Sequence, residues 1–149
     1  MAPREGAGRV ILAVDPGGTT GWAVRYDDGR IEYGQDAPLD FCTRAHSMLA
    51  AAHDRGEHTE VVCESFSIRA DTIKKSFQPD ALELIGVLRY LSHWLGADFI
   101  LSPPANKALF PNDRLKLIGW YAKGMDHARD ALRHLAYRSL RRGIIALPQ

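Results

Sequence analysis

The spacing of hydrophobic and polar residues along the chain predicts five strands. The predicted strands are residues 9–15, 20–26, 30–36, 59–64 and 97–101. Each is a short apolar or alternating run bounded by glycine, proline or polar residues, which is typical of strands. The turn Asp27-Asp28-Gly29 joins the second strand to the third, so the first three strands are expected to form a meander.

Apolar residues at helical spacing predict four helices, and the polar residues 65–77 are predicted to form a loop. The predicted helices are 39–55, 79–95, 112–122 and 126–142. The expected apolar faces of the first two are Leu39, Phe41, Cys42, Ala45, Met48, Leu49 and Ala52, and then Leu82, Ile85, Val87, Leu88 and Leu91. Pro79 suits the first position of a helix and Gly143 suits the end of one. The predicted order is βββ-α-β-α-β-α-α.

The length and composition predict one globular domain. The chain has 149 residues, of which 46% are hydrophobic and 25% charged, values typical of a soluble protein. Residues 1–8 are expected to be a flexible tail and residues 9–149 the domain. No apolar stretch approaches the roughly 20 residues of a membrane span, and a signal-peptide core is not evident. Cys42 and Cys63 form no metal or disulfide pattern, so a cytoplasmic location is expected.

The charge is distributed unevenly between the two halves of the chain. Residues 1–63 carry 6 basic and 10 acidic side chains, whereas residues 64–149 carry 13 basic and 8 acidic ones. The second half is therefore a candidate surface for binding phosphates. The alternative is an ordinary helical surface, and charge by itself favours neither.

Three carboxylates lie at the ends of predicted elements. Asp15 follows the apolar run from Val10 to Val14, Glu64 ends the fourth predicted strand, and Asp130 lies in the last predicted helix. A carboxylate at the end of a buried strand is unfavourable unless a cation or a donor compensates its charge. Oxygen ligands of this kind suit Mg²⁺ or Mn²⁺ better than zinc. The three acids therefore predict a divalent-metal site.

Each of these residues also has a simpler interpretation, and the sequence leaves it open. Asp15 can begin a turn with Pro16 and Gly17, Glu64 can be a surface acid, and Asp130 can pair with His134 on an exposed helix face. His127 shares a helix face with Asp130 but can simply be solvated. Asp126 is expected to be the N-cap of the last helix, because a side-chain oxygen is favoured there.

The order of the elements and the placed acids resemble a known fold and family. The order is that of the ribonuclease H-like fold, and the residues resemble those of RuvC Holliday junction resolvases over about Val10 to Leu140. The matching residues are Asp15 with Pro16, Gly17 and Gly21, Glu64 after the fourth strand, and the run His127-Ala128-Arg129-Asp130-Ala131-Leu132. The resemblance implies an α/β fold with a five-stranded mixed sheet, in the order 3-2-1-4-5, flanked by helices. The short chain fits a phage-encoded member, which would act in the host cytoplasm.

The same resemblance implies a catalytic site formed by Asp15, Glu64, His127 and Asp130. Two Mg²⁺ or Mn²⁺ ions would serve phosphodiester hydrolysis there, leaving 5′-phosphate and 3′-hydroxyl ends. His127 would either bind a metal or orient the attacking water.

The resemblance also implies contacts to branched DNA. The loop after Glu64 is expected to reach the junction, with Phe66 or Phe77 inserted at its centre or, alternatively, buried as an anchor. The expected phosphate contacts are Arg69, Lys74, Lys75 and, near the scissile phosphate, Lys107.

A homodimer is expected, because paired incision of a two-fold symmetric junction needs two active sites. The 79–95 helix is the candidate interface, with Tyr90 and Trp94 either in that interface or in the core. Alternative functions are a broader nuclease for branched DNA and flaps, a nuclease for RNA–DNA hybrids, and a junction-binding module without catalysis.

Gly17, Gly18 and Gly21 allow a tight reversal and the close approach of a phosphate backbone. They also resemble the phosphate loop of sugar kinases and actin-like ATPases. A kinase or ATPase of that type would need a second domain to close over ATP, and 149 residues leave no room for one. Neither a nucleotide cofactor nor a membrane partner is therefore expected.

Overall fold

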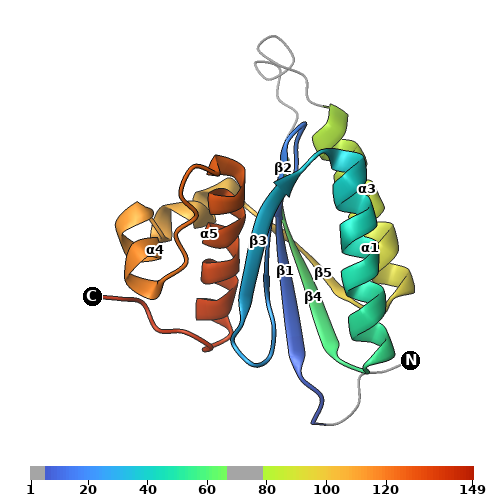
Figure 1. Cartoon of the computed structure of the whole chain (residues 1–149), viewed down its shortest axis with the longest axis horizontal. Coiled ribbons are helices and arrows are strands. Elements are labelled where there is room, and N and C mark those ends of the chain that lie inside the picture. Colours follow the sequence, from blue (N-terminus) through green and yellow to red (C-terminus); the bar gives the residue numbers. More distant parts are fainter. Residues whose placement is uncertain (1–5, 67–78) are drawn as a thin grey trace.

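The computed structural model describes residues 6–66 and 79–149, and a five-stranded sheet forms its centre (Figure 1). The strands are β1 (Arg9–Asp15), β2 (Thr20–Arg25), β3 (Ile31–Asp36), β4 (His58–Glu64) and β5 (Asp98–Ser102). Their order is β3-β2-β1-β4-β5. The pairs β1–β2 and β2–β3 are antiparallel, whereas β1–β4 and β4–β5 are parallel. The predicted meander and the mixed 3-2-1-4-5 sheet are therefore confirmed.

Helices cover both faces of this sheet. They are α1 (Pro38–Asp54), α3 (Pro79–Trp94), α4 (Asn112–Ile118) and α5 (Asp126–Arg141), with a 3-10 helix, η1 (Pro104–Leu109), after β5. Figure 1 shows α1 and α3 on one face and α5, with α4 beyond it, on the other. The prediction of a helix over 112–122 is wrong at its end, because Gly119 adopts a left-handed φ of 77° and stops α4 at Ile118.

The side chains of β1 alternate between the two faces. Val10, Leu12 and Val14 pack in the core beneath α1 and α3, whereas Ile11 and Ala13 pack in the core beneath α5. This two-residue period places Asp15 on the α5 face. In β4, Val62 faces α5 in the same way, which places Glu64 beside Asp15. The two carboxylates therefore meet beneath α5.

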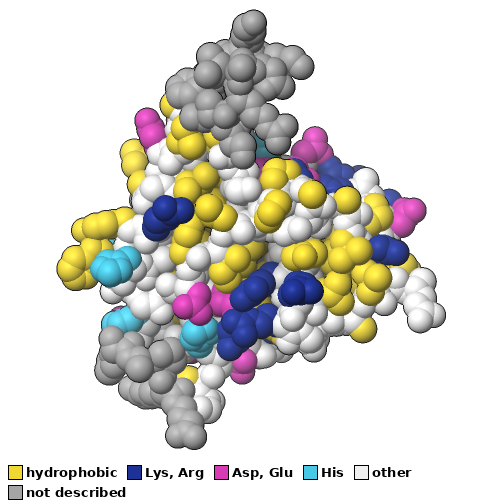
Figure 2. Space-filling model, turned by 180° about the vertical axis from the view of Figure 1, so that it is seen from behind, with side chains coloured by type: hydrophobic (Ala, Val, Ile, Leu, Met, Phe, Trp, Pro, Cys, Tyr) yellow, Lys and Arg dark blue, Asp and Glu magenta, His cyan; other side chains and the backbone are white. Residues whose placement is uncertain are grey.

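The buried faces of the first two helices differ in part from the predicted ones. Leu39 is 81% exposed and Val87 is 39% exposed, so neither belongs to the core. In α3 the fully buried positions are Ala81, Leu84, Leu88 and Ser92. More apolar residues lie around α3 than the sheet can cover, so those on one side of the helix are buried and the others stay exposed. Figure 2 shows hydrophobic side chains left exposed, among basic ones, on the rear face of the molecule.

A buried ion network joins α5 to the start of the sheet. Glu60 of β4 is fully buried and contacts Arg9 at 2.5 Å, Arg138 at 2.6 Å and also Arg142. Burial raises the pKa of Glu60, but Arg138 and then Arg142, which directly follows α5, outweigh that effect and hold its pKa below the usual range. The C-terminal end of α5 is thereby tied to the sheet. Among the described helices, none has the length and apolar character needed to cross a bilayer.

Candidate active site

The N-terminus of α5 docks on three residues that lie in one row across the sheet. Asp15 of β1 pairs with Gly21 of β2, and Gly21 pairs with Gln35 of β3. A Cβ atom at Gly21 would lie only 2.0 Å from the carbonyl oxygen of His127. Gly21 therefore allows the backbone of α5 to approach the sheet closely, which brings His127 to Asp15. The partner of this close approach is the α5 backbone, whereas the sequence suggested a phosphate backbone.

Gln35 provides the acceptor for the first turn of α5. Its Oε1 accepts hydrogen bonds from the backbone N–H groups of His127, at 2.9 Å, and Ala128, at 3.2 Å. The prediction that Asp126 is the N-cap is wrong, because Met125 occupies that position and Asp126 pairs with Arg129. The cap comes instead from a distant strand, which satisfies the free N–H groups that a local side chain would otherwise serve.

Asp15 is a largely buried carboxylate with an unfavourable charge. Its Oδ2 lies 3.1 Å from Nδ1 of His127, and its side chain is 14% exposed. Burial, followed by repulsion from Glu64 and Asp130, raises the pKa of Asp15 to about 6, although His127 partly opposes this. The site therefore holds excess negative charge near Asp15.

Glu64 has a partner on each of its two oxygens. Oε1 lies 3.1 Å from Nζ of Lys107, and Oε2 lies 3.1 Å from Nε2 of His134. Burial raises the pKa of Glu64, but His134 and then Lys107 outweigh it, so the pKa lies below its ordinary value. Because the side chain is only 14% exposed, Glu64 is not the surface acid of the simpler interpretation.

Asp130 repeats this arrangement. Its Oδ1 lies 2.6 Å from Nη1 of Arg133, and its Oδ2 lies 3.4 Å from Nζ of Lys107. The surface pair between Asp130 and His134 is wrong, because His134 is fully buried and contacts Glu64 instead. Burial lowers the pKa of Lys107, but Glu64 and Asp130 raise it above the usual value. The Lys107 ammonium thus bridges the two carboxylates.

The chemistry of these donors fits a divalent metal ion. Within residues 6–66 and 79–149, no three His, Cys, Asp or Glu side chains are already arranged around a metal position. The Lys107 ammonium instead serves as the cation between Glu64 and Asp130. Asp15 has no part in this bridge, and burial and repulsion from Glu64 and Asp130 raise its pKa to about 6, so the site favours more positive charge. Oxygen ligands of this kind match Mg²⁺ or Mn²⁺.

Comparison with known proteins identifies the fold. The sequence matches no family model and no curated protein. Among solved structures, the chain is similar to Thermus thermophilus RuvC in complex with a Holliday junction substrate, with a TM-score of 0.60 and 17% identity over 91% of this chain and 96% of that one. A second Thermus thermophilus RuvC structure gives a TM-score of 0.56 and 16% identity over 94% of this chain and 99% of that one. The chain has the RuvC fold. The fold class expected from the sequence is thus confirmed.

In this RuvC fold, a small cavity opens beside the carboxylates. It measures about 170 Å³ and is lined by Asp15, Pro16, Glu64, Ser65, Phe66 and Ala81. Phe66, a predicted DNA contact, therefore lies next to the site. The other predicted contacts of the loop, Arg69, Lys74, Lys75 and Phe77, lie outside the described residues.

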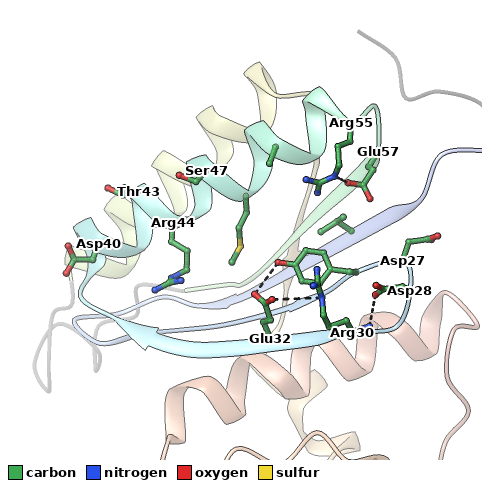
Figure 3. Close-up of a pocket in the computed structure, with 14 residues that line it drawn as sticks. Asp27, Asp28, Arg30, Glu32, Asp40, Thr43, Arg44, Ser47, Arg55 and Glu57 are labelled. Atoms are coloured by element: carbon green, nitrogen blue, oxygen red, sulfur yellow. Dashed lines mark hydrogen bonds and ion pairs between the residues drawn. The ribbon is translucent and has the colours of Figure 1, made fainter.

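A larger groove of about 900 Å³ lies elsewhere, between α1 and the β2–β3 hairpin (Figure 3). Several of its side chains contact one another: Arg55 pairs with Glu57, and Glu32 contacts both Arg30, at 4.0 Å, and Tyr26, at 3.3 Å. The lining nevertheless holds more acidic than basic side chains. The carboxylates beneath α5 are the better candidate for metal chemistry, because burial and mutual repulsion raise the pKa of Asp15.

Several residues that contact the carboxylates or fix the position of α5 were not predicted from the sequence. The helical spacing of His127, Asp130 and His134 was an available signal, because residues separated by three and four positions share one helix face. Arg133 was a less distinctive signal, since arginines are common on helix surfaces. Gln35 carried no local signal, because its partner lies 92 residues away in the chain.

Proposed function

We propose that the protein is a metal-dependent endonuclease that cuts branched DNA, with four-way junctions as its substrate. The observation that carries this proposal is that Asp15, Glu64 and Asp130 lie close enough to repel one another, with Lys107 between Glu64 and Asp130. Carboxylates held close together against mutual repulsion are unfavourable for stability, and a function that needs a metal explains such an arrangement. The RuvC fold supports a nuclease rather than another metal-dependent activity.

In this proposal Asp15, Glu64 and Asp130 hold Mg²⁺ or Mn²⁺, two ions per site. Bound there, such ions would supply the activation of a water molecule and the charge stabilisation of the 3′ oxygen that phosphodiester hydrolysis needs. His127 lies against Asp15 and either completes the ligand set or orients the water. Lys107 is the cation that would contact the scissile phosphate once the carboxylates are neutralised.

Branched DNA is the proposed partner. A Thermus thermophilus RuvC with this fold has been solved with a Holliday junction substrate. We assign base stacking to Phe66, which borders the cavity beside Asp15 and Glu64. Phe77, Arg69, Lys74 and Lys75 remain proposed contacts of the adjacent loop. The two thiols, Cys42 and Cys63, are free, which fits the reducing conditions of a cytoplasm.

The proposed assembly is a homodimer formed through α3. Tyr90 and Trp94 are 63% and 66% exposed, so the alternative that they pack in the core is wrong. Their rings contact edge to face, with centroids 6.3 Å apart, and Val87 lies on the same helix with 39% exposure. An exposed aromatic pair of this kind favours burial against a second copy.

The test uses labelled synthetic substrates: a four-way junction, a duplex, a flap and an RNA–DNA hybrid, each in EDTA, Mg²⁺ and Mn²⁺. Paired symmetric nicks in the junction alone, and only with metal, are the expected result. Cleavage of the whole panel would identify a general nuclease instead. Junction binding without any cleavage would leave only a binding module.

Two aspartate variants show whether the proposed site performs the reaction. Asp15→Asn removes the central charge with little change of shape and is expected to abolish cleavage. Asp54→Asn is the matched control, because its side chain is 84% exposed at the end of α1. Cleavage that survives in Asp15→Asn would contradict the proposed site.

A further inference from the structure

We propose that His134 is a positioning residue, which holds one oxygen of Glu64 and so reserves the other for a bound cation. This role rests on the proposed function, because it concerns the same metal site. His134 belongs to a series of four hydrogen-bonded side chains that runs from η1 through β5 and α5 to β4. The chain is Asn106, Ser102, His134 and Glu64.

The contacts of His134 are short and fully enclosed. The imidazole is 0% exposed, with Nε2 at 3.1 Å from Oε2 of Glu64 and Nδ1 at 2.8 Å from Oγ of Ser102. Ser102 is 2% exposed, and its Oγ also accepts a hydrogen bond of 2.9 Å from Nδ2 of Asn106. Both ring nitrogens are thus engaged inside the protein. A buried histidine held in this way cannot turn without losing two hydrogen bonds.

The donor groups give this chain a direction. The amide nitrogen of Asn106 can only donate, so the Ser102 hydroxyl accepts from it and has one proton left to donate. Among the described residues, the other partner of this hydroxyl is Nδ1 of His134. At the other ring nitrogen, a carboxylate oxygen can only accept, so Nε2 of His134 donates to Oε2 of Glu64 and Nδ1 is left to accept from Ser102. The chain therefore presents a donor to Oε2.

Holding Oε2 restricts where Oε1 can lie. Rotation of the Glu64 carboxylate away from His134 would leave a buried N–H without an acceptor, which is unfavourable. Oε1 is consequently kept on the side of Lys107, whose ammonium is 3.1 Å away. This is the oxygen that remains for a cation. Hydrogen bonds of this type orient metal ligands and change metal affinity by about 10- to 100-fold.

Asp130 shows the same division of its two oxygens. Arg133 holds Oδ1 at 2.6 Å, whereas Oδ2 faces Lys107 at 3.4 Å. The holding residues, His134 and Arg133, are neighbours on α5, and the two outer oxygens share one ammonium. The repeated pattern indicates that α5 orients both carboxylates toward a single cation position.

Two substitutions of His134 distinguish a role in orienting Glu64 from a role in core packing alone. Glutamine places its amide near the position of Nε2 and can still donate to Glu64, whereas asparagine places its amide near Nδ1 and reaches only Ser102. The readout is the affinity of the DNA-free full chain for Mn²⁺, measured by the electron paramagnetic resonance signal of free Mn²⁺. We expect His134→Asn to weaken binding about 10- to 100-fold and His134→Gln to restore it to within about threefold of wild type. His46→Asn, at an exposed position of α1, is the control substitution.

Equal Mn²⁺ affinity in wild type, His134→Asn and His134→Gln would overturn the role of His134 while leaving the proposed function intact. If His134→Asn does not fold, Ser102→Ala serves instead, and it is expected to weaken binding severalfold. Unchanged affinity in Ser102→Ala would then count against the chain. A ¹⁵N NMR spectrum of the imidazole should show the proton on Nε2, and a proton on Nδ1 would also overturn the proposed direction. If wild type and Asp15→Asn both fail to bind Mn²⁺, the proposed function itself falls, and the role of His134 with it.

Discussion

Gly21 and His127 are in direct backbone contact, with no room for a side chain between them. A Cβ atom at position 21 would come within 2.0 Å of the His127 carbonyl oxygen and 2.7 Å of the Ala128 nitrogen. The lost space could be recovered only by moving α5 away from β2. Since α5 carries His127, Asp130 and His134, the geometry of the whole site depends on this contact.

We therefore expect Gly21→Ala to reduce cleavage by about 100-fold or more, because a displacement of about 1 Å in a catalytic group has that effect. The clash should also lower the free energy of unfolding by about 1–3 kcal/mol. Junction cleavage and chemical denaturation measure the two effects. Gly18→Ala is the control, because the nearest atom to its Cβ outside the adjacent residues would be Oδ2 of Asp80, at an ordinary 3.5 Å. Equal loss of activity in both variants would contradict this explanation.

Asp15 should make stability depend on pH in an unusual direction. The pKa of its carboxyl is raised from 3.8 to about 6, so between these values the folded protein binds more protons than the unfolded chain. The free energy of unfolding contributed by this group therefore falls as the pH rises through that window, and the loss is complete above it. Denaturation of the metal-free protein at a series of pH values measures the slope.

Asp15→Asn should remove this slope and stabilise the metal-free protein at neutral pH by about 1–3 kcal/mol. In wild type, added Mg²⁺ should raise the melting temperature by binding the folded state, and Asp15→Asn should lose that increase. Differential scanning calorimetry with EDTA or Mg²⁺ gives both values. The exposed Asp54→Asn variant should behave as wild type. A destabilised Asp15→Asn protein would show that the carboxylate is structural.

Lys107 should compete with the metal for the carboxylates. Its ammonium lies 3.1 Å from Glu64 and 3.4 Å from Asp130, both partly buried, so its removal frees two acceptor oxygens. We expect Lys107→Met to bind Mn²⁺ about tenfold more tightly, corresponding to about 1.4 kcal/mol. Cleavage should nevertheless fall, because the proposed phosphate contact is lost. Mn²⁺ titration and single-turnover cleavage separate the two effects.

Lys123→Met, at an exposed position, controls for the loss of one positive charge. Weaker Mn²⁺ binding in Lys107→Met than in this control would show that Lys107 supports the metal site rather than competing with it.

The exposed aromatic pair on α3 predicts the oligomeric state. Wild type should sediment as a dimer, and Trp94→Glu should sediment as a monomer, because burying a carboxylate in an apolar interface is strongly unfavourable. Leu117→Glu is a matched control, since Leu117 on α4 is also 66% exposed. Analytical ultracentrifugation distinguishes the species. A Trp94→Glu dimer, or a monomeric wild type, would exclude α3 as the interface.

Much of the fold followed from local periodicity. The apolar runs of β1 and β4 were sufficient to predict both strands, and their two-residue alternation places Asp15 and Glu64 on one face of the sheet. The spacing of His127 and Asp130 likewise predicted a shared helix face. Local patterns were less informative at boundaries and at surfaces. Gly119 ended α4 early, and Leu39 and Val87 were apolar residues that the sheet left exposed.

Local periodicity was sufficient to predict which carboxylates could meet, because strand and helix periods are properties of the local backbone. The partners of each carboxylate, in contrast, depend on how distant segments pack. Gln35 caps α5, His134 holds Glu64 across 70 residues, and Lys107 bridges Glu64 and Asp130. Differences of a few ångströms in the packing of segments far apart in the chain decide which side chains come into contact. Those distances depend on how closely α5 packs on Gly21, which no periodic pattern encodes.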